Sequence, residues 1–269
     1  MTFAAYETGQ DTGSPVELYS IAQGGTAFRF TSAIDDYMYA SNVYPSAAVS
    51  RDRIVYSAER KQDTLKVSMP SELDFPQLYK DIVPSERATL TITRVHRDDP
   101  DQEGAVLHKG IVQVVAFSND GFTASLTVIP LSSALSQSIP RKSFQGLCSH
   151  FLYDGECQVA QNSFKHEDTI LTVLGAQITV QNLAGKGDGW ATGGFAQIGS
   201  TEFRLIMAHA GDIATLLLPF PTDVTGSTVS VFAGCAHTRA ICASKFGNFI
   251  NYGGFAWVPL INIYADGLV

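Results

Sequence analysis

The sequence predicts a mainly β protein with two β-rich domains of barrel or sandwich type. Short segments that alternate apolar and polar residues, separated by Gly-, Asn- and Pro-containing turns, fill both halves of the chain. Helical periodicity is scarce. Between Pro130 and Pro140 the composition changes to a serine-rich stretch bounded by prolines. We therefore expect an N-terminal domain over residues 1–135 and a C-terminal domain over residues 136–269.

The elements of the N-terminal half follow from these patterns. The sequence Asn119-Asp120-Gly121 lies between two apolar runs and is a strong signal for a hairpin within 104–131. The one helical candidate is 71–82, with Ser71 as its N-cap and Pro76 limiting it to a couple of turns. Further short strands are expected at 15–22, 51–59, 63–70 and 88–96.

The C-terminal half again predicts short strands joined by Gly-rich turns. These are expected within 169–183, 201–219 and 227–235, followed by a glycine- and aromatic-rich end over 246–264. No internal repeat is found.

The composition restricts the function classes. Hydrophobic residues make up 45% and charged residues 16% of the chain, and the charged share of an average protein is about 25%. A surface with few charges suits a subunit buried in an assembly. The net charge of −8 argues against sequence-independent nucleic-acid binding. We find no signal peptide and no stretch of 18 apolar residues, so we expect folding in a cytoplasm, where disulfides are disfavoured.

The four cysteines form two close pairs, Cys148 with Cys157 and Cys235 with Cys242. Buried thiols or disulfides would each be possible, but paired cysteines confined to one half favour a Cys₄ metal site, around which the C-terminal domain would be built. The eight and six intervening residues exceed the two to four typical of zinc knuckles. This spacing favours a [4Fe–4S] cluster, with zinc as the alternative. His150 and His237 could replace a cysteine, but ordinary hydrogen bonding is the expected role of each.

The sequence offers no catalytic residue. It contains no G-x-S-x-G elbow, Walker loop or H-E-x-x-H motif. A cysteine–histidine nucleophile pair would need geometry that sequence proximity does not supply. We therefore expect a protein that is not an enzyme.

A set of motifs resembles a known family. It comprises a Pro-Arg-x-x-Phe lead-in, two cysteine pairs, a Phe-x-Asn motif and a Gly-Gly-Phe segment ending in proline. These residues are Pro140, Arg141, Phe144, Cys148, Cys157, Cys235, Cys242, Phe246, Asn248, Gly253, Gly254, Phe255 and Pro259. The pattern resembles the baseplate hub, or tail-tip, proteins of long-tailed phages and gene transfer agents. The small tail-tip protein of phage lambda is a more distant functional counterpart.

The resemblance implies a structural protein of the virion, at the tail tip, assembled in the cytoplasm of a bacterial host. Such hubs are homotrimers that join the distal tail protein to central fibre or receptor-binding proteins. Several hold a [4Fe–4S] cluster on four cysteines, which here implies Cys148, Cys157, Cys235 and Cys242. The alternative functions are a metal-dependent, tail-associated hydrolase that acts in cell-envelope penetration, and a receptor-binding tip protein.

Overall fold

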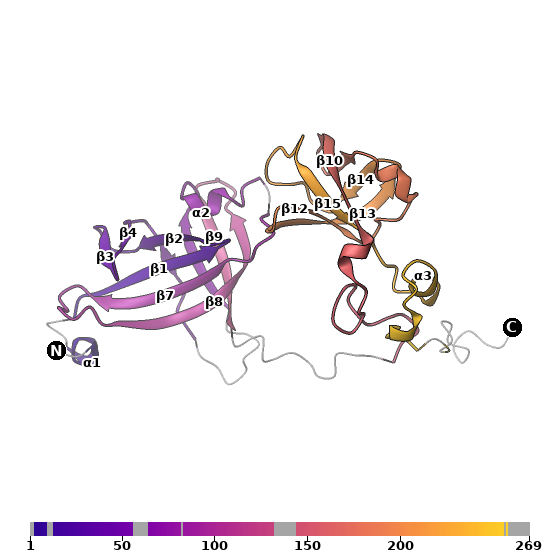
Figure 1. Cartoon of the computed structure of the whole chain (residues 1–269). Helices are drawn as coiled ribbons and strands as arrows, with labels where there is room; N and C mark the ends of the chain where they lie inside the picture. Colours follow the sequence, from indigo (N-terminus) through magenta and orange to yellow (C-terminus); the bar gives the residue numbers. More distant parts are fainter. Residues whose placement is uncertain are drawn as a thin grey trace. The chain divides into compact units, whose positions relative to one another are not determined.

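The computed structural model describes residues 3–9, 13–55, 64–81, 83–131, 144–255 and 257. The chain divides into two compact units, Met1–Gln137 and Ser138–Val269, each with its own sheet (Figure 1). The expected boundary at 135/136 lies outside the described residues, as do Pro140, Arg141 and Pro259. Within the described ranges, no helix has the length and apolar character needed to cross a membrane.

The first unit is a curved antiparallel sheet of seven strands in the order β2-β1-β7-β8-β9-β6-β5 (Figure 1). One face of the sheet carries a core that includes Tyr19, Ile21, Leu90 and Leu126. The strands are β1 (Pro15–Gln23), β2 (Thr26–Thr31), β5 (Ser50–Arg51), β6 (Leu65–Pro70), β7 (Thr89–His96), β8 (Gly104–Phe117) and β9 (Thr123–Pro130). A separate hairpin pairs β3 (Tyr37–Tyr39) with β4 (Asn42–Tyr44), and the helices are α1 (Phe3–Thr8) and α2 (Asp74–Gln77).

Most of the predicted N-terminal elements are confirmed, including the β8–β9 hairpin around Asn119-Asp120-Gly121. The strand expected over 51–59 is wrong in its described part, because β5 ends at Arg51 and 52–55 are not strand. The predicted helix is also shorter than expected. Ser71 is not its N-cap, because its hydroxyl donates to the Gly121 carbonyl at 2.5 Å; Leu73 occupies the N-cap position instead.

A partly buried ion-pair network joins β1, β5 and β7. The Glu17 carboxylate lies 2.5 Å from the Arg51 guanidinium and 3.2 Å from that of Arg94, and it accepts a hydrogen bond from the Tyr19 hydroxyl at 3.0 Å. Burial raises the pKa of Glu17, but the bonds from both arginines outweigh it, so the net pKa is lowered from 4.5. The charged carboxylate therefore stabilises the folded unit.

We expect this network to make the first unit sensitive to acid. Because the folded pKa of Glu17 lies below its unfolded value, the stabilisation is present above about pH 4.5 and is lost as pH falls through the folded pKa. Glu17→Gln should cost on the order of 1–3 kcal/mol at neutral pH and flatten the acid limb of a denaturation series. The exposed Glu72→Gln is the matched control. An unchanged acid limb in Glu17→Gln would contradict this role.

The second unit is a closed barrel in the order β10-β11-β14-β13-β12-β15 (Figure 1). It confirms the barrel form of the predicted β-rich domain. Its interior is filled by side chains such as Ile170, Ile178, Ile206 and Val229, all fully buried. The strands are β10 (Lys165–Leu174), β11 (Gln177–Val180), β12 (Phe195–Ile198), β13 (Glu202–Ala210), β14 (Ile213–Leu216) and β15 (Thr228–Phe232). Short helices are η2 (Gln161–Phe164), η3 (Leu183–Lys186), α3 (Arg239–Ser244) and η4 (Phe249–Asn251).

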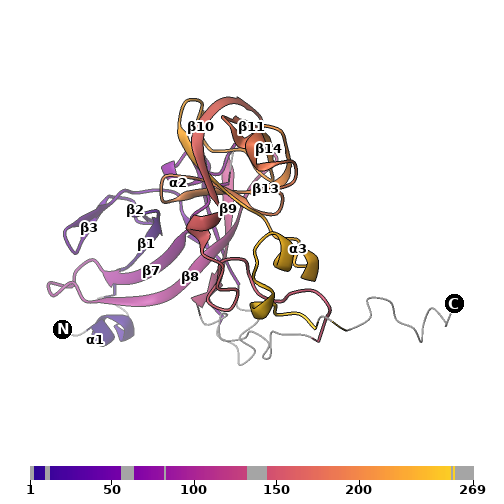
Figure 2. The same cartoon turned by 45° about the vertical axis from the view of Figure 1, so that its right-hand side comes forward.

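Two segments of this unit lie outside the barrel core. Among the described residues, the buried apolar cluster of the barrel contains side chains from Ile170 to Val231 and none from 144–169 or 232–255. The segment before η2 and the segment that carries α3 lie side by side in both views (Figures 1 and 2). These two segments hold all four cysteines. Their described apolar contacts are local, such as that of Phe164 with Phe246.

Candidate metal centre

The first cysteine loop, Cys148–Cys157, is shaped by Asp154. Its carboxylate accepts backbone N–H bonds from Cys157 at 2.5 Å, Glu156 at 3.0 Å and Phe151 at 3.1 Å. The bond from Cys157 contributes most to lowering the pKa of Asp154. This arrangement turns the chain back on itself, as expected for the sequence Asp154-Gly155-Glu156. Asp154 therefore fixes the position of Cys157.

The second loop runs from the end of β15 into α3. Cys235 follows the strand, and Thr238 caps the helix by accepting a hydrogen bond from the Ile241 N–H at 3.4 Å. Cys242 is buried on α3. The sequence reasoning missed this helix, although a threonine three residues before Ile241 is an N-cap signal. The helix places Cys242 at the cavity that the first loop also lines.

All four cysteines line one small cavity, together with His150, Leu152, Val159, His237, Phe246 and Asn251. The cavity and its mouth leave about 330 Å³ free of protein atoms. All four are free cysteines, so no disulfide is formed between them. Within the described part of the chain, no three Cys, His, Asp or Glu side chains lie close enough together to hold one metal ion. The thiols thus surround a common space without converging on a single point.

Three of the sulfurs receive hydrogen bonds from the protein. The backbone N–H groups of Gly253 and His237 each donate at 3.3 Å, to Cys148 Sγ and Cys235 Sγ respectively. The Asn248 side chain approaches Cys157 Sγ at 3.9 Å and donates to the Cys157 carbonyl at 2.5 Å. Such donors stabilise negative charge on sulfur. Asn248 belongs to the Phe-x-Asn motif and follows the second loop. Its side chain therefore links that part of the chain to the first loop.

The thiols also affect one another's ionisation. Burial raises the pKa of the Cys235 and Cys242 thiols, and the neighbouring cysteines raise it further. Burial likewise raises the pKa of Tyr252, with smaller contributions from Cys148, Cys242 and Cys235. Four thiolates could share this space only if a cation or cluster neutralised them.

The His150 side chain and the His237 main chain form hydrogen bonds around the cysteine loops. His150 Nδ1 lies 3.2 Å from the Asn251 carbonyl, and Nε2 lies 3.5 Å from the Glu156 carboxylate. The main chain of His237 accepts a bond from the Cys148 N–H at 2.8 Å. These contacts tie the two loops together.

The Gly-Gly-Phe motif packs closely against the start of the first cysteine loop. A Cβ atom on Gly253 would lie 2.4 Å from His150 Nε2, and one on Gly254 would lie 2.7 Å from the Gly146 carbonyl oxygen. The Phe255 ring packs on that of Phe144, with centroids 3.8 Å apart. Both glycines are required by space, since neither has a positive φ.

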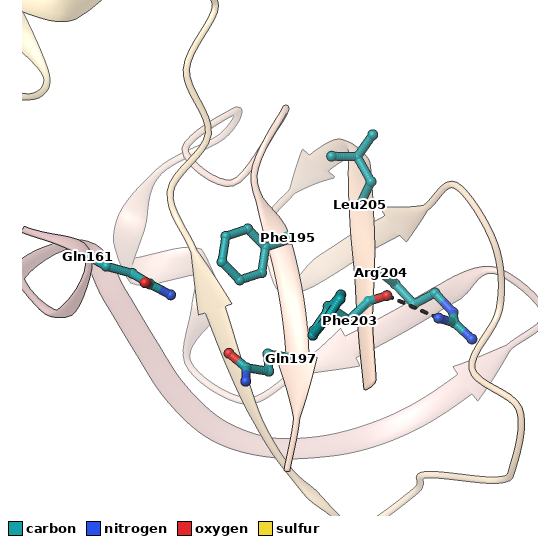
Figure 3. Close-up of a pocket in the computed structure, with 6 residues that line it drawn as sticks. All are labelled: Gln161, Phe195, Gln197, Phe203, Arg204 and Leu205. Atoms are coloured by element: carbon teal, nitrogen blue, oxygen red, sulfur yellow. Dashed lines mark hydrogen bonds between the residues drawn. The ribbon is translucent and has the colours of Figure 1, made fainter. Parts of the chain in front are cut away.

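A second, larger pocket lies on the outer face of β12 and β13 (Figure 3). It leaves about 750 Å³ free of protein atoms. Its lining consists of Gln161, Phe195, Gln197, Phe203, Arg204 and Leu205. The Arg204 guanidinium is occupied, donating to the carbonyls of Pro219 at 2.8 Å and Phe203 at 3.0 Å. The described lining therefore combines apolar side chains with two glutamines and an arginine whose guanidinium is already bonded.

Comparison with known proteins relates both halves of the chain to phage proteins. A sequence model described as "Baseplate hub protein, N-terminal attachment domain" matches residues 16–160, more than half of the chain. A second, described as "Phage conserved hypothetical protein BR0599", matches residues 189–261, which include Cys235 and Cys242.

An uncharacterised protein of Xylella fastidiosa (strain 9a5c) is 30% identical over 70 residues, which cover 26% of this chain and only 15% of that protein. A chain from the virion of a native gene transfer agent particle has the same fold. It aligns with a TM-score of 0.76 and 19% identity, over 100% of this chain and 95% of that one. With the motifs described above, these matches confirm the resemblance read from the sequence. The chain belongs to the baseplate hub protein family, and thus to the structural proteins of the virion.

Proposed function

We propose that this chain is the tail-tip hub of a long-tailed phage or related particle, stabilised by a structural [4Fe–4S] cluster on Cys148, Cys157, Cys235 and Cys242. In this role it joins the distal tail protein to central fibre or receptor-binding proteins. The observation that carries the proposal is that four cysteines from two distant segments line one cavity.

The donor set suits a cluster better than a single ion. Thiolates are soft ligands that bind either zinc or iron–sulfur clusters. One zinc ion requires four sulfurs at about 2.3 Å from one point, whereas a cubane takes each thiolate at a separate iron. The cysteines share a cavity, and their spacings of eight and six residues are wider than those of zinc knuckles. This arrangement supports the cluster, with zinc as the alternative.

A cluster would also account for the fold of the two cysteine segments. Small regions without a sufficient hydrophobic core usually need metals or disulfides for stability. The described parts of 144–169 and 232–255 contribute no side chain to the barrel core. When bound, the cluster would supply four metal–thiolate bonds that link loops far apart in the sequence.

Metal analysis tests this proposal directly. Anaerobically purified protein should absorb broadly near 400 nm and contain about four iron and four sulfide per chain. One zinc per chain would retain the four-cysteine site and reject the cluster. Four titratable thiols without metal would reject both. Peptidoglycan cleavage that is lost on Cys235→Ser would instead support a metal-dependent hydrolase.

We further propose that the hub is a homotrimer whose contacts include the outward face of β13. Phe203, Leu205 and Met207 alternate along this strand, and each is about half exposed. Outward positions of a barrel in water are usually polar. An apolar row suits a surface that is covered in an obligate assembly.

Leu205→Glu should therefore weaken the trimer at least tenfold, because a carboxylate would be buried without a partner. Mass photometry or light scattering over a dilution series would measure the change. Leu174→Glu, at an exposed leucine outside the pocket, is the control. A monomeric wild-type chain, or a Leu205→Glu trimer of unchanged affinity, would contradict the proposal.

A further inference from the structure

Lys245 bridges the barrel and the second cysteine loop. It occupies the C-cap of α3, and its ammonium donates to the Trp190 carbonyl at 2.5 Å and to the Gly234 carbonyl at 2.7 Å. Trp190 belongs to the barrel, and Gly234 directly precedes Cys235. One side chain thus connects the helix that carries Cys242 to the residue that positions Cys235.

The ammonium lies in an apolar setting. It is 5.8 Å from the centre of the Trp190 ring and 5.4 Å from that of Phe246, and Phe246 also lines the cysteine cavity. Burial lowers the pKa of Lys245, and the nearby Cys235 opposes this effect. Among the described residues, no carboxylate lies within ion-pair distance of Lys245.

The two carbonyls satisfy part of the hydrogen bonding of the ammonium, and nearby negative charge stabilises a partly buried cation further. The cysteine site is a source of such charge in this part of the molecule. Its four thiolates carry negative charge when they bind iron, and the ammonium donates to the carbonyl of Gly234, the residue before Cys235.

We propose that Lys245 is a positioning residue of the cysteine site and its fixed counter-charge. It holds the Cys235 loop against α3 and offsets the negative charge of the ligated sulfurs. The inference rests on the proposed cluster. A positive charge near an iron–sulfur site favours its reduced state, because reduction adds one negative charge.

The test compares Lys245→Met with Lys186→Met. Lys186 is exposed, and its ammonium lies 5.3 Å from the centre of the same Trp190 ring. Methionine keeps an unbranched stem and removes the charge. For Lys245→Met we expect several-fold faster iron loss to a chelator. We also expect a reduction equilibrium shifted about tenfold toward the oxidised cluster, which is 59 mV for one electron. Lys186→Met should match wild type in both measurements.

Lys245→Arg separates charge from shape. A potential close to wild type in Lys245→Arg, with the shifted potential in Lys245→Met, supports the counter-charge. If Lys245→Met fails to fold, a loaded Lys245→Arg at the wild-type potential still supports it. The counter-charge proposal is overturned if neither variant folds. It is also overturned if Lys245→Met has the reduction potential of wild type. A wild-type chain without iron and sulfide overturns the proposed cluster together with this inference, so the two failures are distinguishable.

Discussion

Cys235→Ser is expected to abolish cluster binding and to unfold the two cysteine segments while the barrel stays folded. A structural metal site contributes on the order of 10 kcal/mol to the region that it organises. A serine hydroxyl at neutral pH cannot replace a thiolate ligand. Because the described cysteine segments add no side chain to the buried cluster of the barrel, and contact the barrel through peripheral side chains such as Tyr153 and Lys245, the loss should be local.

Hydrogen exchange combined with iron analysis measures this effect. Amides of 144–164 and 233–255 should lose protection, and those of β10 to β15 should keep it. Equivalent substitutions of Cys148, Cys157 and Cys242 should give the same result. Ala243→Ser, at an exposed position beside Cys242, introduces a serine without removing a ligand and should resemble wild type. Full protection in an iron-free Cys235→Ser chain would show that the segments fold without metal.

Gly234→Ala is expected to damage both the barrel and the cysteine site. A Cβ atom at Gly234 would lie 1.9 Å from the Thr192 carbonyl oxygen and 2.3 Å from the Gly194 nitrogen. Both are backbone atoms, so the clash cannot be relieved by a side-chain rotation. We expect a loss of about 3 kcal/mol or more in the free energy of unfolding, with reduced iron content because Cys235 is the next residue.

Chemical denaturation and iron content of the same preparation test this prediction. Gly185→Ala is the matched control, because a Cβ atom there meets nothing within 4 Å. If Gly234→Ala has wild-type stability, the backbone at Gly234 can move away from that of Thr192 and Gly194, and the prediction is wrong. If stability falls but iron content stays at the wild-type value, the substitution affects the barrel and leaves the cysteine site intact.

The sequence by itself determined the repeating, short-range features of this protein. Alternation identified β1, β7 and the β8–β9 hairpin, because strand periodicity and turn chemistry are local properties. It also identified the cysteines as a set and the family motifs around them. In its described part the edge strand β5 was overestimated, because it ends at Arg51 although β6 continues to Leu65.

Only the tertiary structure decided how distant residues meet. Ser71 was predicted to cap a helix but bonds to the β8–β9 turn. The sequence analysis did not predict α3, which begins between Cys235 and Cys242. Segments separated by many residues meet at three places. Both cysteine loops line one cavity, Gly253 and Gly254 pack on the first loop, and Lys245 bonds to Gly234. Such contacts arise when the barrel brings β10 and β15 together as neighbours, which places the flanking cysteine loops side by side. Local propensity carries no information about that pairing, because it depends on the closure of the whole sheet.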